Sequence, residues 1–170
     1  MTVYVGLLRA VNVGGTGKLP MAELKAMCET LGFKNVRTYI ASGNVLFESS
    51  ETEAQVKSLL AARLHKYAGK PVGVVIRTAR ELAAILKGNP FPKAAPNRAL
   101  VVFLDAPPAK DALAHATGRK DEEMRLGRRE IFVHYPDGAG ASKLRIPAGQ
   151  SGTARNINTI TALLKLAGSA

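Results

Sequence analysis

The chain has 170 residues and a mass of 18.0 kDa, a length that suits one domain or two small ones. Apolar residues make up 46% and charged residues 22%, a balance that excludes a disordered chain, and the single cysteine excludes an intramolecular disulfide framework. Lys and Arg total 24 against 13 Asp and Glu, so the formal net charge is +11. We therefore expect a globular protein with its own hydrophobic core and a strongly basic surface.

The basic excess is spread along the whole chain. Residues 1–87 carry 12 basic and 6 acidic side chains, and residues 88–170 carry 12 basic and 7 acidic ones. The isoelectric point near 10.1 is typical of nucleic-acid-binding proteins, but a well-solvated surface gives the same value. Charge alone leaves these two interpretations open.

The N-terminal half predicts the element order β-α-β-β-α-β of the ferredoxin-like fold. Ser50 and Glu53 have the spacing of a capping box at the start of the second helix, and Ser42-Gly43-Asn44 reads as a hairpin turn. The expected elements are a strand over 3–8, a helix from Pro20 to Gly32, strands over 36–40 and 45–48, a helix ending at Gly69 and a strand over 72–76.

The C-terminal half predicts the order α-β-α-β-β-α. Thr78 and Glu81 form another capping box at the start of its first helix. A strand over 99–104, a short helix over 109–117, a hairpin of 123–126 with 131–135, a long loop over 136–153 and a final helix from about Thr153 follow. The expected fold class is α+β: a ferredoxin-like subdomain over 1–77 and a second α+β subdomain of αβαββα topology over 78–170 packed against it, or one continuous domain.

Several familiar motifs are poorly matched. The glycine-rich turn before Lys18 resembles a P-loop, but Asn12 stands where the first glycine belongs and Leu19 where Ser or Thr would hold magnesium. Binding of an anion by the turn and Lys18 remains reasonable. The two central strands of a ferredoxin-like sheet can stack RNA bases, but here they offer only Tyr4 and Phe47, and Phe47 reads as a core residue.

No metal or cofactor site is predicted. The three histidines are scattered along the chain, and Cys28 lies on the apolar stripe of the first helix. No carboxylate pair suggests general acid–base catalysis.

Polar residues and glycines gather where the predicted elements begin and end. Helix N-termini favour anions, and guanidinium groups bind phosphate or carboxylate bidentately. Asn and Ser at the ends of helices and strands also make ordinary caps and turns. For any one of these residues taken alone, such a structural role is the alternative to ligand binding. As a set we interpret these residues as a candidate anion site, if folding brings them together: Arg9, Asn12, Gly14, Gly15, Gly17, Lys18, Ser42, Asn44, Lys143, Arg155 and Asn156.

Several segments resemble the bacterial domain-of-unknown-function family 1697, and the likeness covers essentially the whole chain. The resemblance implies an α+β fold with ferredoxin-like content and a cytoplasmic bacterial protein, and it implies no settled activity. The segments that carry it are Leu7 to Gly15, Lys18 with Pro20-Met21, Thr38 to Val45, Asn89-Pro90-Phe91, Ser142-Lys143-Leu144 and Thr153 to Asn156.

The leading functional hypothesis is a cytoplasmic protein that binds a phosphate or another anion, with nucleic acid or a nucleotide-like small molecule as its ligand. No secretory signal and no membrane-spanning segment is predicted, so we expect no membrane partner. One alternative is a metal-independent enzyme that acts on a small phosphorylated or carboxylated substrate, with Lys18 or Lys143 as the titratable group. The other is an interaction or scaffold protein in which the polar set makes only turns and caps.

Overall fold

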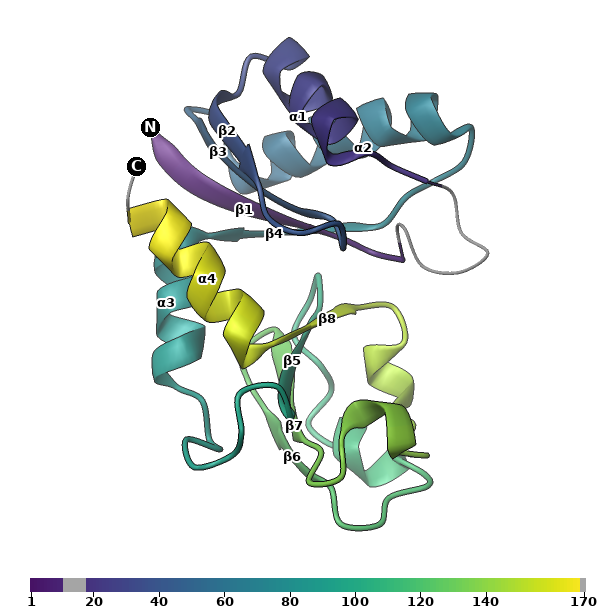
Figure 1. Cartoon of the computed structure of the whole chain (residues 1–170). Coiled ribbons are helices and arrows are strands. Elements are labelled where there is room, and N and C mark those ends of the chain that lie inside the picture. The colour runs from purple at the N-terminus through teal and green to yellow at the C-terminus, as the bar shows by residue number, and fades with distance from the viewer. Residues whose placement is uncertain (11–17, 169–170) are drawn as a thin grey trace. The chain divides into compact units, whose positions relative to one another are not determined.

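The computed structural model describes residues 1–10 and 18–168 (Figure 1). The fold is mixed α+β, as predicted, and it contains two four-stranded antiparallel sheets, of which the second has one strand more than the three predicted for the C-terminal half. The chain divides into two compact units: Met1–Leu82 together with Leu163–Ala170, and Ala83–Ala162.

The first unit contains a sheet of strand order β2-β3-β1-β4, which is the ferredoxin-like arrangement. Two strands begin two residues away from their predicted positions, since the predictions were 36–40 for β2 and 72–76 for β4. The elements are β1 (Thr2–Leu8), α1 (Met21–Thr30), β2 (Lys34–Thr38), β3 (Asn44–Ser49), α2 (Glu53–Ala68) and β4 (Val74–Thr78).

Helices α1 and α2 cover one face of this sheet and enclose an apolar core (Figure 1). Phe33 and Phe47 stack in it with ring centroids 4.3 Å apart, and Phe47 is fully buried. The Tyr4 ring packs beside Phe47, and its hydroxyl donates a hydrogen bond of 2.6 Å to the carbonyl of Glu51. Both aromatic side chains of the central strands therefore belong to the core and are not displayed as a platform for bases.

The N-cap of α2 differs from the prediction. Thr52 is the cap, because its extended backbone lets the side chain accept a hydrogen bond of 3.2 Å from the backbone N–H of Gln55. The Gln55 side chain in turn accepts one of 2.9 Å from the N–H of Thr52. Ser50 and Glu53 have the same spacing but lie two residues too early.

We expect Thr52→Ala to lower the free energy of unfolding by about 1 kcal/mol, because the N-cap side chain accepts a hydrogen bond from a backbone N–H that has no partner within the helix. Ser50→Ala is the matched control and should change it by less than about 0.5 kcal/mol. Urea denaturation of both variants measures the difference. Equal effects of the two substitutions would contradict the assignment of Thr52 as the cap.

Cys28 is a core residue of α1, as predicted, and is fully buried. Burial raises the pKa of its thiol from 9.0 to about 12, with a smaller contribution from Glu29. The thiolate is the reactive form, so we expect the folded protein to resist iodoacetamide at pH 8 and to be labelled only at the rate of unfolding. Alkylation followed by mass spectrometry tests this: labelling in native buffer as fast as in urea would contradict it.

The second unit repeats the strand order of the first, with β6-β7-β5-β8 in place of β2-β3-β1-β4. Short 3₁₀ turns occupy the places of the two connecting helices. Its strands are β5 (Ala99–Phe103), β6 (Glu123–Leu126), β7 (Glu130–His134) and β8 (Thr153–Asn156), and its 3₁₀ turns are Ala112–His115, Ala139–Ala141 and Pro147–Gly149.

The prediction of a helix from Thr153 was wrong. Residues 153–156 pair with β5, with Thr153 opposite Phe103 and Arg155 opposite Val101, and α4 (Ile157–Gly168) begins only after them. The short helix predicted over 109–117 is a single 3₁₀ turn. A four-residue strand has too few positions to show its alternation, so the helical pattern that follows it masked its presence.

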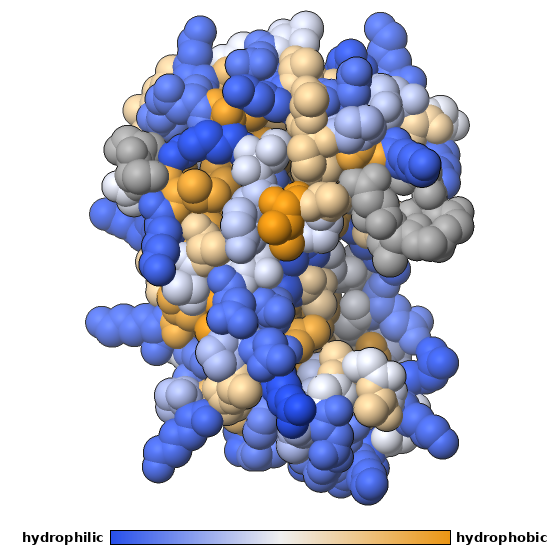
Figure 2. Space-filling model, viewed as in Figure 1, coloured by the Kyte–Doolittle hydropathy of each residue, from blue (hydrophilic) through white to orange (hydrophobic). Residues whose placement is uncertain are grey.

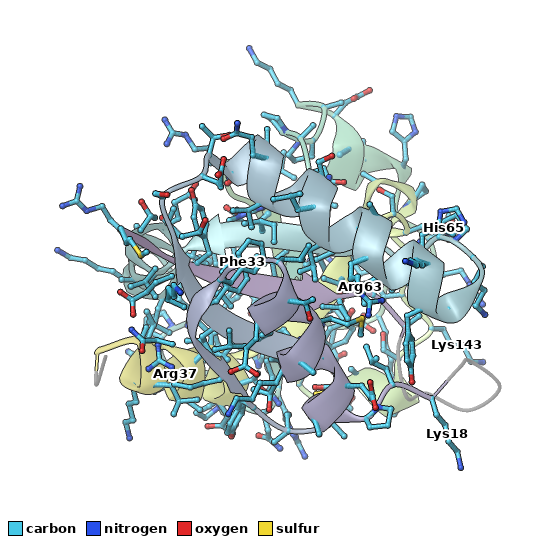
Figure 3. The ribbon with its side chains drawn as sticks, turned by 90° about the horizontal axis from the view of Figure 1, so that it is seen from above. Lys18, Phe33, Arg37, Arg63, His65 and Lys143 are labelled. Atoms are coloured by element: carbon cyan, nitrogen blue, oxygen red, sulfur yellow. The ribbon has the colours of Figure 1, made fainter. Side chains whose placement is uncertain are left out.

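The division between the units falls inside α3 (Ala79–Lys87) and α4. The predicted capping box at the start of α3 is present, with hydrogen bonds of 2.9 and 3.0 Å between Thr78 and Glu81. Within the first unit, Arg37 of β2 lies beside α4 and donates a hydrogen bond to the carbonyl of Leu166 in its last turn (Figure 3). The positive charge of Arg37 at the C-terminal end of α4 also interacts favourably with the helix dipole.

Candidate functional site

A pocket of about 500 Å³ lies in the first unit, where β1 leaves the sheet and α2 ends. Four short segments form its walls: the residues after β1, the residues before α1, the last turns of α2, and the connection from α2 into β4. The left-handed Gly69, at φ 71°, ends α2 and turns the chain into that connection. The pocket is lined by Arg9, Ala10, Lys18, Leu19, Leu64, Tyr67, Ala68, Lys70, Pro71, Val72 and Gly73.

Arg9 is held in this pocket by its backbone and by its stem. Its N–H donates a hydrogen bond of 2.8 Å to the carbonyl of Gly73. A Cβ atom placed on Gly73 would lie 3.1 Å from the Arg9 Cβ and 3.4 Å from its Cδ, so the arginine stem lies directly over the glycine. Ala10, the next residue, has the uncommon φ of 54°. Backbone strain of this kind is often found at functional sites.

The floor of the pocket is apolar and its rim is polar. Leu19 and Leu64 are buried and Val72 is partly buried, whereas the Tyr67 side chain is 42% exposed. An exposed tyrosine ring beside a concave apolar floor can stack on a planar ligand group.

The charges around the pocket all have one sign. Arg9, Lys18 and Lys70 are exposed, and Lys18 extends away from the ribbon (Figure 3). The described residues that line the pocket include no Asp or Glu, and the sequence from 11 to 17 contains none either. Over the surface in general, hydrophilic side chains are spread widely across the visible face (Figure 2). The pocket therefore differs from the rest of the surface because its described lining contains no acidic side chain, whereas polar side chains are common across the visible face (Figure 2).

The structure places other predicted site residues of the first unit differently. Asn44 is fully buried, and its amide donates hydrogen bonds of 3.0 Å to the carbonyl of Tyr39 and to the hydroxyl of Ser42. Ser42 and Asn44 thus take part in the β2–β3 turn and do not line the pocket. Four further predicted residues lie outside the described residues: Asn12, Gly14, Gly15 and Gly17.

Two of the predicted site residues in the second unit make local contacts. Arg155 is buried in β8, where its guanidinium donates to the Thr153 hydroxyl at 2.6 Å and to the Ala154 carbonyl at 2.9 Å. Burial lowers the pKa of Arg155 to about 10. Asn156 accepts a hydrogen bond of 2.9 Å from the N–H of Thr159 and so caps α4.

Lys143 lines a different pocket, of about 330 Å³, which belongs to the second unit. The described residues contain no group of three or more His, Cys, Asp or Glu side chains that could hold a metal ion. Among residues 1–10 and 18–168, no helix has the length and apolar character needed to cross a membrane.

Sequence reasoning missed Tyr67 and Lys70. Tyr67 follows the buried Leu60 and Leu64 of α2 at helical spacing, which by itself indicates a core residue, and Lys70 lies in a connection without a recognisable motif. The topology offered a signal: in a β-α-β-β-α-β sheet, β1 and β4 are antiparallel neighbours, so the end of β1 meets the start of β4. This pairing places the residues just before β4 near Arg9, which follows β1.

Residues 1–132 match a family model described as a protein of unknown function (DUF1697). Among solved structures, the chain resembles conserved bacterial protein SP0830 from Streptococcus pneumoniae, at 26% sequence identity and a TM-score of 0.81. The similarity covers 97% of this chain and 98% of that one. A comparison with curated proteins found no match.

Proposed function

We propose that this chain, which belongs to the DUF1697 family of proteins of unknown function, binds a phosphate-bearing, nucleotide-like ligand in the pocket of its first unit. One observation carries the proposal: Arg9, Lys18 and Lys70 surround an apolar floor, and the described lining contains no acid. Several positive side chains around one pocket give a local potential that attracts an anion. We call this site the Arg9 pocket.

The two halves of the lining suit the two halves of a nucleotide. A guanidinium and two ammonium groups provide donors for a phosphate, and arginine can bind phosphate through two parallel hydrogen bonds. The floor and the Tyr67 ring provide apolar surface for a base, and stacking on an aromatic side chain is worth about 1–3 kcal/mol. A volume of about 500 Å³ lies within the usual range for small-molecule sites.

The lining supports binding more directly than catalysis. The described residues around the Arg9 pocket include no Asp, Glu, His or Cys, so a general base or nucleophile among them would have to be Lys18, Lys70 or Tyr67. A free nucleotide and the end of a nucleic-acid strand share the same phosphate-ester chemistry, so the experiment must separate these two sources.

Isothermal titration with AMP, adenosine, ribose 5-phosphate and a six-nucleotide single-stranded RNA tests the proposal. We expect AMP to bind at least tenfold more tightly than adenosine or ribose 5-phosphate, because only AMP uses both halves of the site. Binding of AMP and RNA with equal affinity and little salt dependence indicates that a single nucleotide is read. A steep loss of RNA affinity with salt indicates several phosphate contacts along a strand. Equal binding of AMP and adenosine would overturn the proposal.

A further inference from the structure

The pocket of the second unit contains a buried carboxylate, that of Glu122, which is only 3% exposed. One of its oxygens accepts a hydrogen bond of 2.6 Å from the N–H of Lys120, and the other accepts one from the Ser142 hydroxyl. The Ser142 oxygen in turn accepts a hydrogen bond of 3.0 Å from the N–H of Leu144. Glu122 therefore joins the segment before β6 to the segment around Lys143.

These hydrogen bonds hold Glu122 in its charged form. The Ser142 hydroxyl, followed by the backbone N–H of Lys120, lowers the pKa of the Glu122 carboxyl. A depressed pKa makes Glu122 a poor proton acceptor for Ser142, so the pair is not an activated nucleophile.

The donors to this carboxylate are all neutral. Within the described residues, no Lys, Arg or His side chain forms an ion pair with Glu122. The charge of Glu122 is thus stabilised by hydrogen bonds from uncharged groups, and a cationic group that reached the carboxylate would add a charge-assisted interaction. Glu122 lines a pocket of about 330 Å³.

The rest of this lining carries both signs of charge. Lys120 and Lys143 contribute ammonium groups, Asp121 and Asp137 contribute carboxylates, and Tyr135 contributes a partly buried ring. This mixture contrasts with the Arg9 pocket, where the described lining has only positive charges. A simple anion would face Glu122, and a simple cation would face two lysines.

We propose that this second pocket binds a small zwitterion of the amino-acid type, with its ammonium group beside Glu122 and its carboxylate beside Lys143. The ligand then supplies the counter-charge that Glu122 lacks, and the lysine receives the opposite end. The proposal is independent of the Arg9 pocket.

Isothermal titration with L-alanine and with its two halves, ethylammonium and propanoate, tests this proposal. L-lysine and L-glutamate extend the panel. We expect L-alanine to bind at least roughly tenfold more tightly than either half, because each charged end adds a charge-assisted hydrogen bond. The proposal would be overturned if L-alanine bound no more tightly than ethylammonium or propanoate. It would also be overturned if 100 mM potassium, in place of sodium, displaced L-alanine, because that result would indicate a simple cation site.

Variants separate the two ends of the ligand. Glu122→Gln should weaken L-alanine binding roughly tenfold or more by removing the buried charge. Because that substitution also alters the contact with Ser142, Lys143→Met is the second variant: Lys143 is exposed, and its loss should reduce L-alanine to the affinity of ethylammonium. Lys93→Met, an exposed lysine of the same unit outside the lining, is the control and should bind as wild type. Unchanged binding by Lys143→Met would contradict the proposed orientation.

Discussion

Gly118→Ala is expected to lower the free energy of unfolding by roughly 3 kcal/mol, among the larger effects of a single substitution. A Cβ atom at this position would lie 2.1 Å from the carbonyl oxygen of Lys143, which is backbone and cannot rotate away. The contact is fixed by a two-way bridge in which Thr117 and Arg145 exchange backbone hydrogen bonds of 2.9 and 2.8 Å. Gly118 also has a φ of 71°, which disfavours alanine by itself.

Gly138→Ala separates the clash from the backbone strain. Gly138 has a similar positive φ of 88°, but a Cβ atom there would meet nothing within 4 Å. We expect this variant to lose only about 1 kcal/mol, the cost of the left-handed conformation alone. Urea denaturation followed by circular dichroism measures both variants. Equal losses would show that the close approach of Gly118 to Lys143 contributes nothing.

Replacing Arg9 and Lys18 together with methionine is expected to weaken AMP binding about 100-fold. Each charge-assisted contact to a phosphate contributes about 1.5–3 kcal/mol, so the loss of two reaches at least two powers of ten. Both side chains are exposed, and the fold should therefore tolerate the change. Adenosine binding, which uses no phosphate contact, should change far less.

A matched control removes the same charge from elsewhere in the first unit. Lys25 and Lys34 are exposed and do not line the Arg9 pocket. The variant that carries both Lys25→Met and Lys34→Met should therefore keep its affinity for AMP within about twofold of wild type. Gly73→Ala is a positioning variant that keeps every charge but crowds the arginine stem, and it should give an intermediate loss. If the control loses as much affinity as the double variant of Arg9 and Lys18, net charge and not the pocket accounts for binding.

The architecture of the first unit could be predicted because its elements carry strong local signals. Apolar periodicity revealed its helices and strands, and their order is that of a known supersecondary unit. The boundaries were less accurate where two caps compete: Ser50 and Thr52 both have a partner three residues later, and only backbone geometry selects Thr52. The β8 strand was missed because Thr153 pairs with Phe103 and Arg155 with Val101, and contacts so distant in the sequence have no local signature.

The candidate site was harder to predict than the fold, because the same residue types serve turns and ligands. Arg9 and Lys18 line one pocket, whereas Asn44 and Asn156 make the hydrogen bonds of a turn and a helix cap. Tyr67 shows the converse: its helical spacing suggested the core, but it lies at the end of α2 with much of its ring exposed. The position of a polar residue at the end of a helix or strand does not show whether its side chain caps that element or contacts a ligand.

The most direct measurement is a two-dimensional NMR titration of the ¹⁵N-labelled protein with AMP, which reports binding residue by residue. We expect progressive shifts of the backbone amides around the Arg9 pocket, including those of Tyr67, Lys70 and Gly73, with little change at Ser42 or Asn156. Shifts confined to Glu122 and Lys143 in the second unit, or no shift at millimolar AMP, would contradict this expectation.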